Sequence, residues 1–196
     1  MEAFTLYTYE SCPLTVRGQI ENIASELSTN MKGNLLGLYL HGSMVLGGFD
    51  VNSSDIDMIA IVEKELSLKE KIAVSSLLLS LNKKPCPIDI EFFIKDDLLP
   101  WRGAPASHFY FSDYWVMQYE RIALGGEDAG DLLCVVNPGG EATADFKIAR
   151  EHGICLYGAP IAELLPILSD EVFGISYLQA YASILLSLRM TSRVHS

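Results

Sequence analysis

Three short apolar runs, separated by segments of helical periodicity, most constrain the fold of this chain. The runs are LLGLYLHG (35–42), IDMIAIV (56–62) and PIDIEFFI (87–94). Each is typical of a buried strand. Residues 13–31 place apolar side chains at helical spacing, and residues 66–84 form a second helical pattern that ends before a proline. Strands and helices alternating at these lengths predict an α/β sheet covered by helices.

The amino-acid composition of the sequence changes after Pro100. Residues 101–124 are rich in aromatic side chains and favour a strand followed by a helix. Two further helices are expected, one ending at Gly153 and one at 169–190, where Ser169 or Asp170 would be the N-cap. We therefore expect a sheet lobe at 1–105 and a mainly helical lobe at 106–196.

Composition and charge exclude several classes of protein. With 49% apolar and 20% charged residues, the chain is typical of a globular protein, and no apolar run reaches the ~18–20 residues of a membrane span. A net charge of −11 leaves little basic surface for nucleic acid but favours cationic small molecules. The N-terminus lacks the pattern of an export signal, and the four cysteines are widely spaced. We expect a cytoplasmic protein without disulfides, zinc, membrane or nucleic-acid partners.

Acidic side chains stand at the beginnings of two of the expected strands. Alternate side chains of a strand face the same way, so Asp55 and Asp57 share one face, as do Asp89 and Glu91. If the strands are neighbours, three or four carboxylates converge, and two of them ~4 Å apart repel by about 4 kcal/mol at an effective dielectric of ~20. Such a cluster needs a proton, a basic partner or a divalent cation. Oxygen ligands suit Mg²⁺ bound with substrate phosphates, and paired metal ions serve phosphoryl and nucleotidyl transfer.

The Gly42-Ser43 pair at the end of the first run fits the same chemistry. A glycine there lets the backbone turn sharply and approach a ligand, while the following N–H groups and the Ser43 hydroxyl face a phosphate. The segment is not a Walker loop, because the G-x-x-x-x-G spacings at Gly37–Gly42 and Gly42–Gly47 lack the lysine that would follow. Ser54 joins this candidate nucleotide-binding set, although a serine there is more typical of a turn.

The segment HGSMVLGGFDVNSSDIDMIAIV (41–62) resembles the G-S…S-D-x-D signature of the nucleotidyltransferase superfamily. IDIEFFIKDDLLPWRGAP (88–105) and FKIAREHGICLYGAPIAELL (146–165) narrow the resemblance to the streptomycin/spectinomycin adenylyltransferases of the aminoglycoside-resistance type. The resemblance covers most of the chain from about Leu35 onward. It implies a polymerase-β-like nucleotidyltransferase domain at 1–105, a partial substrate-binding helical lobe at 106–196, and transfer of AMP from Mg-ATP to a drug hydroxyl with release of pyrophosphate.

Matching positions carry the roles of the family onto this chain. Asp55 and Asp57 would bind two Mg²⁺ ions, and Gly42 and Ser43 would hold the triphosphate of ATP. Asp89 would complete the metal site and act as the general base that takes the proton from the attacking hydroxyl.

Two parts of the chain depart from the family pattern or extend it. The third carboxylate is typically glutamate in this branch, so the shorter Asp89 leaves Glu91 as an alternative base or as a substrate contact. Tyr114 and Trp115 fall near an aromatic position that packs on the drug in these enzymes. A core or interlobe stripe is the alternative for these two aromatic residues.

The helical lobe of the family normally continues past the point where this sequence stops, which leaves Arg189 or Arg193 to serve a phosphate. The apolar stripe of the expected helix 169–190 would then be uncovered, so we expect a homodimer in which that helix packs against a second subunit. Two other functions stay open. One is nucleotidyl transfer to a protein or to RNA, against which the acidic charge of the chain argues. The other is a catalytically silent nucleotide-binding or assembly module.

Overall fold

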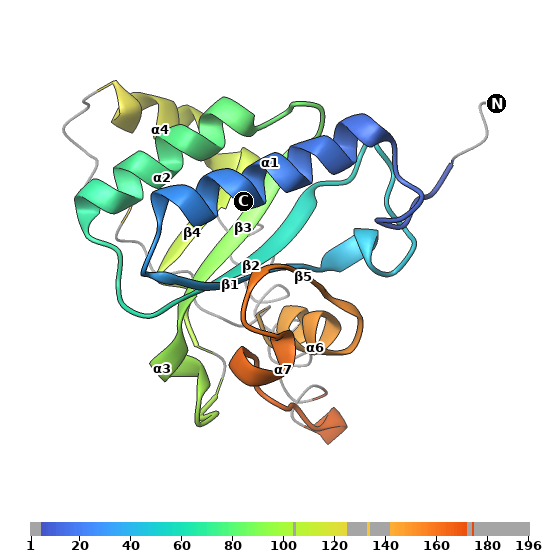
Figure 1. The fold of residues 1–196 in the computed structure, drawn as a ribbon, viewed down its shortest axis with the longest axis vertical. Coiled ribbons are helices and arrows are strands. Elements are labelled where there is room, and N and C mark those ends of the chain that lie inside the picture. The colour runs from blue at the N-terminus through green and yellow to red at the C-terminus, as the bar shows by residue number, and fades with distance from the viewer. Residues whose placement is uncertain (1–4, 104, 125–132, 134–141, 172–173, 175–196) are drawn as a thin grey trace, which may run out of the picture.

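A mixed five-stranded sheet forms the centre of the structure, in the order β4-β3-β2-β1-β5 (Figure 1). The computed structural model describes residues 5–103, 105–124, 133, 142–171 and 174. β2 and β3 run parallel, whereas the other neighbouring pairs are antiparallel. The strands are β1 (Leu35–Leu40), β2 (Ile56–Val62), β3 (Ile88–Ile94), β4 (Phe109–Ser112) and β5 (Ile154–Gly158).

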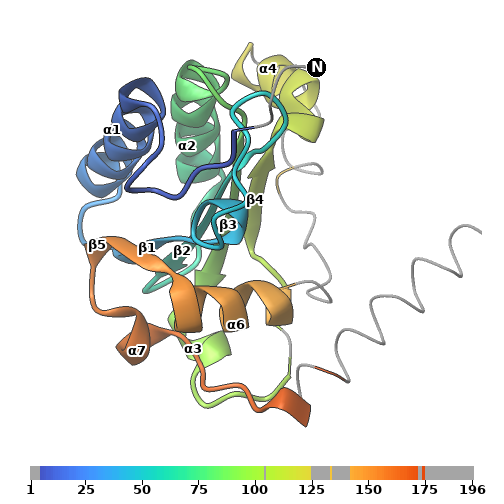
Figure 2. The ribbon, with the colours of Figure 1, turned by 90° about the vertical axis from the view of Figure 1, so that its right-hand side faces the viewer.

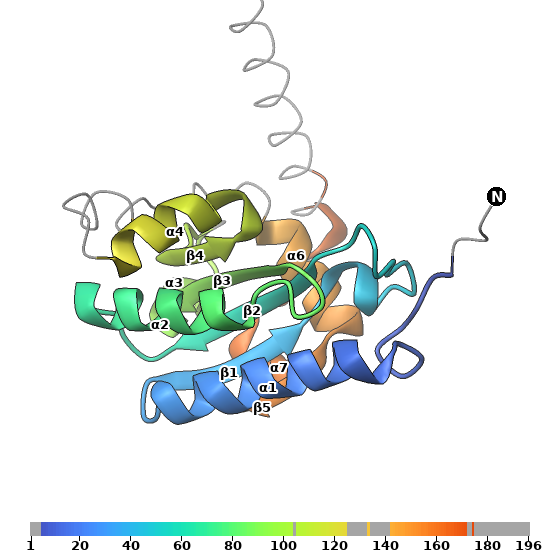
Figure 3. The same ribbon diagram turned by 90° about the horizontal axis from the view of Figure 1, so that it is seen from above.

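Helices cover both faces of this sheet. α1, α2 and α4 lie side by side over one face, while α3, α6 and α7 lie on the other (Figures 2 and 3). The α-helices are α1 (Leu14–Asn30), α2 (Leu68–Leu81), α3 (Lys95–Leu98), α4 (Val116–Ala123), α6 (Ala142–His152) and α7 (Ile161–Leu164). Two 3₁₀ turns are also present: η1 (Gly42–Met44) begins one residue after the end of β1, and η2 (Asp113–Trp115) follows β4 directly.

Each face of the sheet has its own apolar core. On the first face, α1 buries a complete stripe at helical spacing, consisting of Val16, Ile20, Ile23 and Leu27. On the second face, Phe146 of α6 packs edge-on against Phe93 of β3, with ring centroids 4.7 Å apart. Because both faces are covered, the central strands are apolar along their whole length apart from a few charged positions.

Local sequence signals set the ends of several elements. α2 begins at a capping box, in which the Ser67 side chain accepts from the backbone N–H of Glu70 and the Glu70 carboxylate accepts from the backbone N–H of Ser67. α6 ends immediately before Gly153, where a Cβ would come within 2.3 Å of the carbonyl oxygen of Ala149. A residue larger than glycine would therefore clash with the end of that helix.

The α/β class predicted from the sequence is confirmed, and so are the three central strands and the flanking helices. The strand-then-helix pattern expected after Pro100 corresponds to β4 and α4. β5 was not predicted. Both β4 and β5 come from residues after 105 and yet belong to the central sheet. The division into domains at residue 105 stays a prediction.

The expected helix at 169–190 lies almost entirely outside the described residues. Arg189, Arg193 and the apolar stripe on which the homodimer prediction rests fall in the part of the chain that is not described. No helix among the described residues combines the length and the apolar character needed to cross a membrane.

Candidate active site

The turn that follows β1 brings the backbone of the chain against a carboxylate. Gly42 has φ +66°, and a Cβ at this position would lie only 2.0 Å from Oδ2 of Asp57. Only glycine combines that backbone conformation with that space. The backbone N–H of Ser43 donates a hydrogen bond to the Asp57 carboxylate. The Gly-Ser pair and the second aspartate of the D-x-D motif therefore form one contiguous surface.

The parallel pairing of β2 and β3 sets two carboxylates opposite each other. Asp57 and Asp89 are register partners, one residue inside the beginning of their strands. Burial, and then the nearby charges of Asp89 and Asp55, raise the pKa of Asp57 to about 7. No lysine or arginine of the described chain forms an ion pair with Asp57. The protein thus keeps a partly buried carboxylate whose ionised form is costly without a cation.

Asp55 completes this group from the loop before β2. Burial and then the charge of Asp113 raise its pKa, while Lys83 lowers it. Lys83 is held at the edge of the group, with Nζ 2.9 Å from Oδ2 of Asp113, and Asn82 donates to Oδ1 of the same aspartate at 2.9 Å. Asn82 also accepts from the backbone N–H of Ile88, which ties this polar cluster to the beginning of β3. The sequence did not single out Asp113, Lys83 or Asn82.

Asp89 is held from the β4 side by a tyrosine that the sequence pattern also did not indicate. The Tyr110 hydroxyl donates to Oδ2 of Asp89 at 2.7 Å. Glu91 lies two residues further along β3, on the same face as Asp89, and its register partner on β4 is Tyr110. The two candidate bases are therefore separated by one pleat of the strand, and Tyr110 lies beside both.

The other residues expected in the site fall into two groups. Ser54 closes a turn, because its hydroxyl accepts from the backbone N–H of Asp50 at 3.1 Å and its own N–H donates to the Asp50 carbonyl at 2.8 Å. Tyr114 and Trp115 lie in η2, directly after the β4 residue that pairs with Asp89. Tyr114 is 80% exposed and its ring meets that of Trp115 edge-on at 4.9 Å. Their place beside the carboxylates along the chain keeps them as candidate substrate contacts.

His41, which precedes the Gly-Ser pair, is buried directly after β1. Burial lowers its pKa to about 4, so the imidazole is neutral at neutral pH. Its Nδ1 lies 3.8 Å from Oδ1 of Asp145, on α6. His41 therefore faces α6.

The donor set fits a hard cation, with oxygen ligands from two adjacent strands and no thiol or imidazole among them. Within the described residues, however, no three side chains of the metal-binding types already converge on one point. The carboxylates are close enough to raise the pKa of Asp57 and still need a further oxygen ligand. Phosphate oxygens of a bound nucleotide are the ligands that Mg²⁺ takes in such sites.

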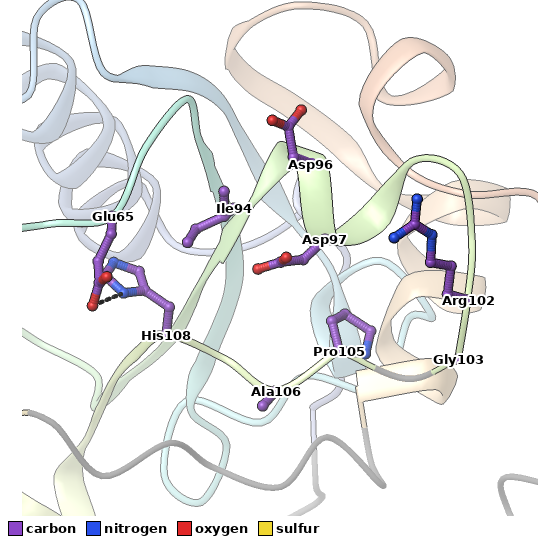
Figure 4. Close-up of a pocket in the computed structure, with 9 residues that line it drawn as sticks. All are labelled: Glu65, Ile94, Asp96, Asp97, Arg102, Gly103, Pro105, Ala106 and His108. Atoms are coloured by element: carbon purple, nitrogen blue, oxygen red, sulfur yellow. Dashed lines mark ion pairs between the residues drawn. The ribbon is translucent and has the colours of Figure 1, made fainter.

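A second acidic region lies at the other end of β2 and β3, around a hollow of about 500 Å³ (Figure 4). Its lining residues are Glu65, Ile94, Asp96, Asp97, Arg102, Gly103, Pro105, Ala106 and His108. The acidic side chains here are exposed, and Glu65 lies near two basic groups, with Lys71 Nζ at 3.8 Å and His108 Nδ1 at 3.6 Å. This region shares no residue with the carboxylate group at the beginning of the strands.

Comparison with known proteins gives two kinds of similarity. In sequence, the chain is 27% identical over 160 residues to a spectinomycin 9-adenylyltransferase of Campylobacter jejuni, an alignment that covers 76% of this chain and 55% of that protein. It is also 27% identical over 142 residues to the enzyme of the same name from Enterococcus faecalis, covering 69% and 52%. The chain thus spans about half the length of the curated relatives it matches. No family model matches it.

In structure, the chain is similar to a spectinomycin adenyltransferase from Enterococcus solved with ATP and spectinomycin. The TM-score is 0.72 at 21% sequence identity, covering 85% of this chain and 66% of the other. At this identity the similarity establishes the fold. The sheet and flanking helices described above share the fold of that structure.

Proposed function

The sequence relatives and the fold both support membership of the aminoglycoside adenylyltransferase family of nucleotidyltransferases, and on this basis we propose that the chain transfers AMP from Mg-ATP. The acceptor is a hydroxyl group of an aminoglycoside-like small cationic molecule, and pyrophosphate is released. The observation that carries this proposal is the contact of Gly42 and Ser43 with Asp57, itself the register partner of Asp89. The turn that would hold the triphosphate and the carboxylates that would hold the metal ions are thereby neighbours.

The polar groups of the site would have different roles in such a transfer. Asp55, Asp57 and Asp89 would hold two Mg²⁺ ions, which when bound neutralise the charge of the phosphates and activate the attacking oxygen. The N–H groups and hydroxyl of the Gly42-Ser43 turn would hold the triphosphate. Because the pKa of Asp57 is about 7 without a cation, binding of cation and nucleotide would release a proton from that carboxyl group.

Asp89 would act as the general base. The acceptor oxygen attacks the α-phosphorus, the bond from that phosphorus to the bridging oxygen of the β-phosphate breaks, and pyrophosphate leaves with the electron pair. The proton of the acceptor hydroxyl passes to Asp89. Glu91, one pleat away, is the alternative base or a contact for the amino groups of the substrate. Tyr114 and Trp115 would pack against the substrate, since one of their rings is largely exposed beside the site.

A pyrophosphate-release assay tests this proposal. Purified protein is incubated with Mg-ATP and, separately, with spectinomycin, streptomycin and other aminoglycosides, and labelled ATP reports whether AMP is attached to the acceptor. Acceptor-dependent release of pyrophosphate supports the proposal. Binding of Mg-ATP without release for any acceptor would favour a silent nucleotide-binding module, and labelling of a protein or an RNA instead would favour the other alternative.

The remaining partner predictions are tested separately. The net charge of −11 supports a cationic small molecule over nucleic acid as the second substrate. A homodimer through residues 169–190 is tested by sedimentation at micromolar concentration, with Leu185→Asp as the variant expected to dissociate it.

A further inference from the structure

Tyr110 contacts the site although nothing in the family resemblance points to it. Its hydroxyl donates to Oδ2 of Asp89 at 2.7 Å from the neighbouring antiparallel strand. The register explains how it reaches, because Asp89 pairs with Ser112 and Tyr110 stands two residues away from Ser112 on β4. Diagonal neighbours of this kind are ~7–8 Å apart at the backbone, a gap that a tyrosine can span.

The backbone that carries Tyr110 is held firmly from α4. The Tyr119 hydroxyl donates to the carbonyl oxygen of Tyr110, and the Tyr119 ring stacks on Phe111 with centroids 4.8 Å apart and planes at 18°. Tyr119 and Phe111 are both buried. The position of the Tyr110 phenol beside Asp89 is therefore fixed by a strand and a helix that pack against each other.

An ionised carboxylate can only accept hydrogen bonds, and a phenol is protonated at neutral pH. Tyr110 is therefore the donor to the Asp89 carboxylate. A donor fixed on Oδ2 sets the plane of the carboxylate and restricts its rotation, so that the other oxygen keeps one direction. Hydrogen bonds to such outer partners are worth ~10–100-fold in metal affinity in known metal sites.

We propose that Tyr110 is a positioning residue, which orients the Asp89 carboxylate toward the metal and the acceptor hydroxyl. This inference rests on the proposed function, because it assigns Asp89 to that chemistry. Tyr110 itself touches neither the metal nor the phosphates in this assignment. Its effect must therefore pass through Asp89.

A double-mutant cycle tests that dependence. Tyr110→Phe removes the hydroxyl and keeps the ring, and Asp89→Asn removes the charge of its acceptor. Binding of Mn²⁺ in the presence of a non-hydrolysable ATP analogue is measured calorimetrically in the four proteins of the cycle, with circular dichroism to check that each is folded. We expect Tyr110→Phe to weaken Mn²⁺ binding about tenfold in the native background and to have little further effect in the Asp89→Asn background. Equal losses in both backgrounds, or no loss in either, would overturn the proposal.

A matched control is Tyr157→Phe, which removes an exposed hydroxyl from β5 at the far edge of the sheet. It should bind Mn²⁺ like the native protein. In the turnover assay, Tyr110→Phe should lower kcat about tenfold with little change in the KM for ATP, as expected for one lost hydrogen bond to a charged group. The Mn²⁺ measurement needs no acceptor. A native protein that binds Mn²⁺ and ATP without releasing pyrophosphate would therefore reject the proposed function while the cycle still decides the role of Tyr110.

Discussion

The two ends of the parallel β2–β3 pair are both acidic, but their carboxylates differ in burial and in the charges around them. At the beginning of the strands, Asp57 is partly buried beside Asp89, and its pKa is raised to about 7. At the other end, Asp96 and Asp97 are exposed around an open hollow, and Glu65 lies near Lys71 and His108. Acidic residues alone therefore do not mark a site. What distinguishes the first end is burial of like charges against a glycine turn.

The largest difference expected between the two ends is in catalysis. Asp57→Asn should lower the rate of transfer about 10³-fold or more, because electrostatic stabilisation of the transition state often contributes more to catalysis than any other effect. Its matched control at the other end, Asp97→Asn, should keep the native rate within about twofold, since exposed surface changes of this kind are mostly neutral. Pyrophosphate release measures both. An active Asp57→Asn protein would contradict the assignment of the catalytic site to the beginning of the strands.

Within the first end, the two candidate bases can be separated. Asp89→Ala should lower kcat by about 10²–10⁴-fold, the usual effect of losing a general base. Glu91→Ala should have a much smaller effect, while calorimetry shows that both variants still bind Mg-ATP. The reverse order of effects would exchange the two assignments, and the hydrogen bond of Tyr110 would then go to the carboxylate that is not the base.

The pH dependence of stability should also differ between the two ends. Because the pKa of Asp57 is raised from 3.8 to about 7, the folded state binds this proton more tightly than the unfolded state. The associated stability is fully present below about pH 3.8 and is lost as pH rises to about 7, with a limiting slope of about 1.4 kcal/mol per pH unit.

Thermal unfolding at a series of pH values measures this effect. The fall in Tm between pH 5 and pH 8 should be steeper in the metal-free native protein than in Asp57→Asn, and Asp97→Asn should behave like the native protein. Identical profiles for the native protein and Asp57→Asn would show that this carboxyl group is not perturbed.

The smallest expected effect concerns the glycine turn. Gly42→Ala places a methyl group 2.0 Å from Oδ2 of Asp57 at φ +66°, so it must both strain the backbone and displace the carboxylate. Gly33→Ala is the matched control, because Gly33 also has a positive φ, +85°, but open space around it. Each should lose ~1–2 kcal/mol of stability from the backbone alone.

Gly42→Ala should additionally weaken Mg-ATP binding, which Gly33→Ala should leave unchanged. Urea unfolding and nucleotide titration measure the two effects. Equal behaviour of the two variants would show that the contact between the turn and Asp57 has no role in binding.

Much of this architecture was accessible from the sequence because the strands carry strong local signals. The apolar runs identify β1, β2 and β3, and strand alternation puts Asp89 and Glu91 on one face of β3. Asp55 was expected to share a strand face with Asp57 but lies in the loop before β2, close enough for its charge to raise the pKa of Asp57. The glycine that precedes Ser43 was also recognisable, since a buried run that ends in glycine indicates a sharp turn.

What the sequence could not indicate is the pairing between distant segments. Tyr110 contacts Asp89 only because of the register between β3 and β4, and no local pattern encodes that register. The contacts of Asp113 depend on the same pairing. Asp113 directly follows β4 and contacts Asn82 and Lys83, which precede β3 in the chain. β5 was missed because ICLYG is short, follows a helix directly and has neither a clear alternation nor a long apolar run.

The position of β5 has a consequence for how the chain is made. β1 is synthesised early, but its second neighbour in the sheet, residues 154–158, follows only after 41–153. Until that segment leaves the ribosome, one side of β1 is an unpaired strand edge, the kind of edge to which other chains add. Nascent chains that stall before Ile154 should therefore depend on chaperones. The strand that covers this edge of β1 ends at Gly158, where a Cβ would lie 2.0 Å from the Leu36 carbonyl oxygen.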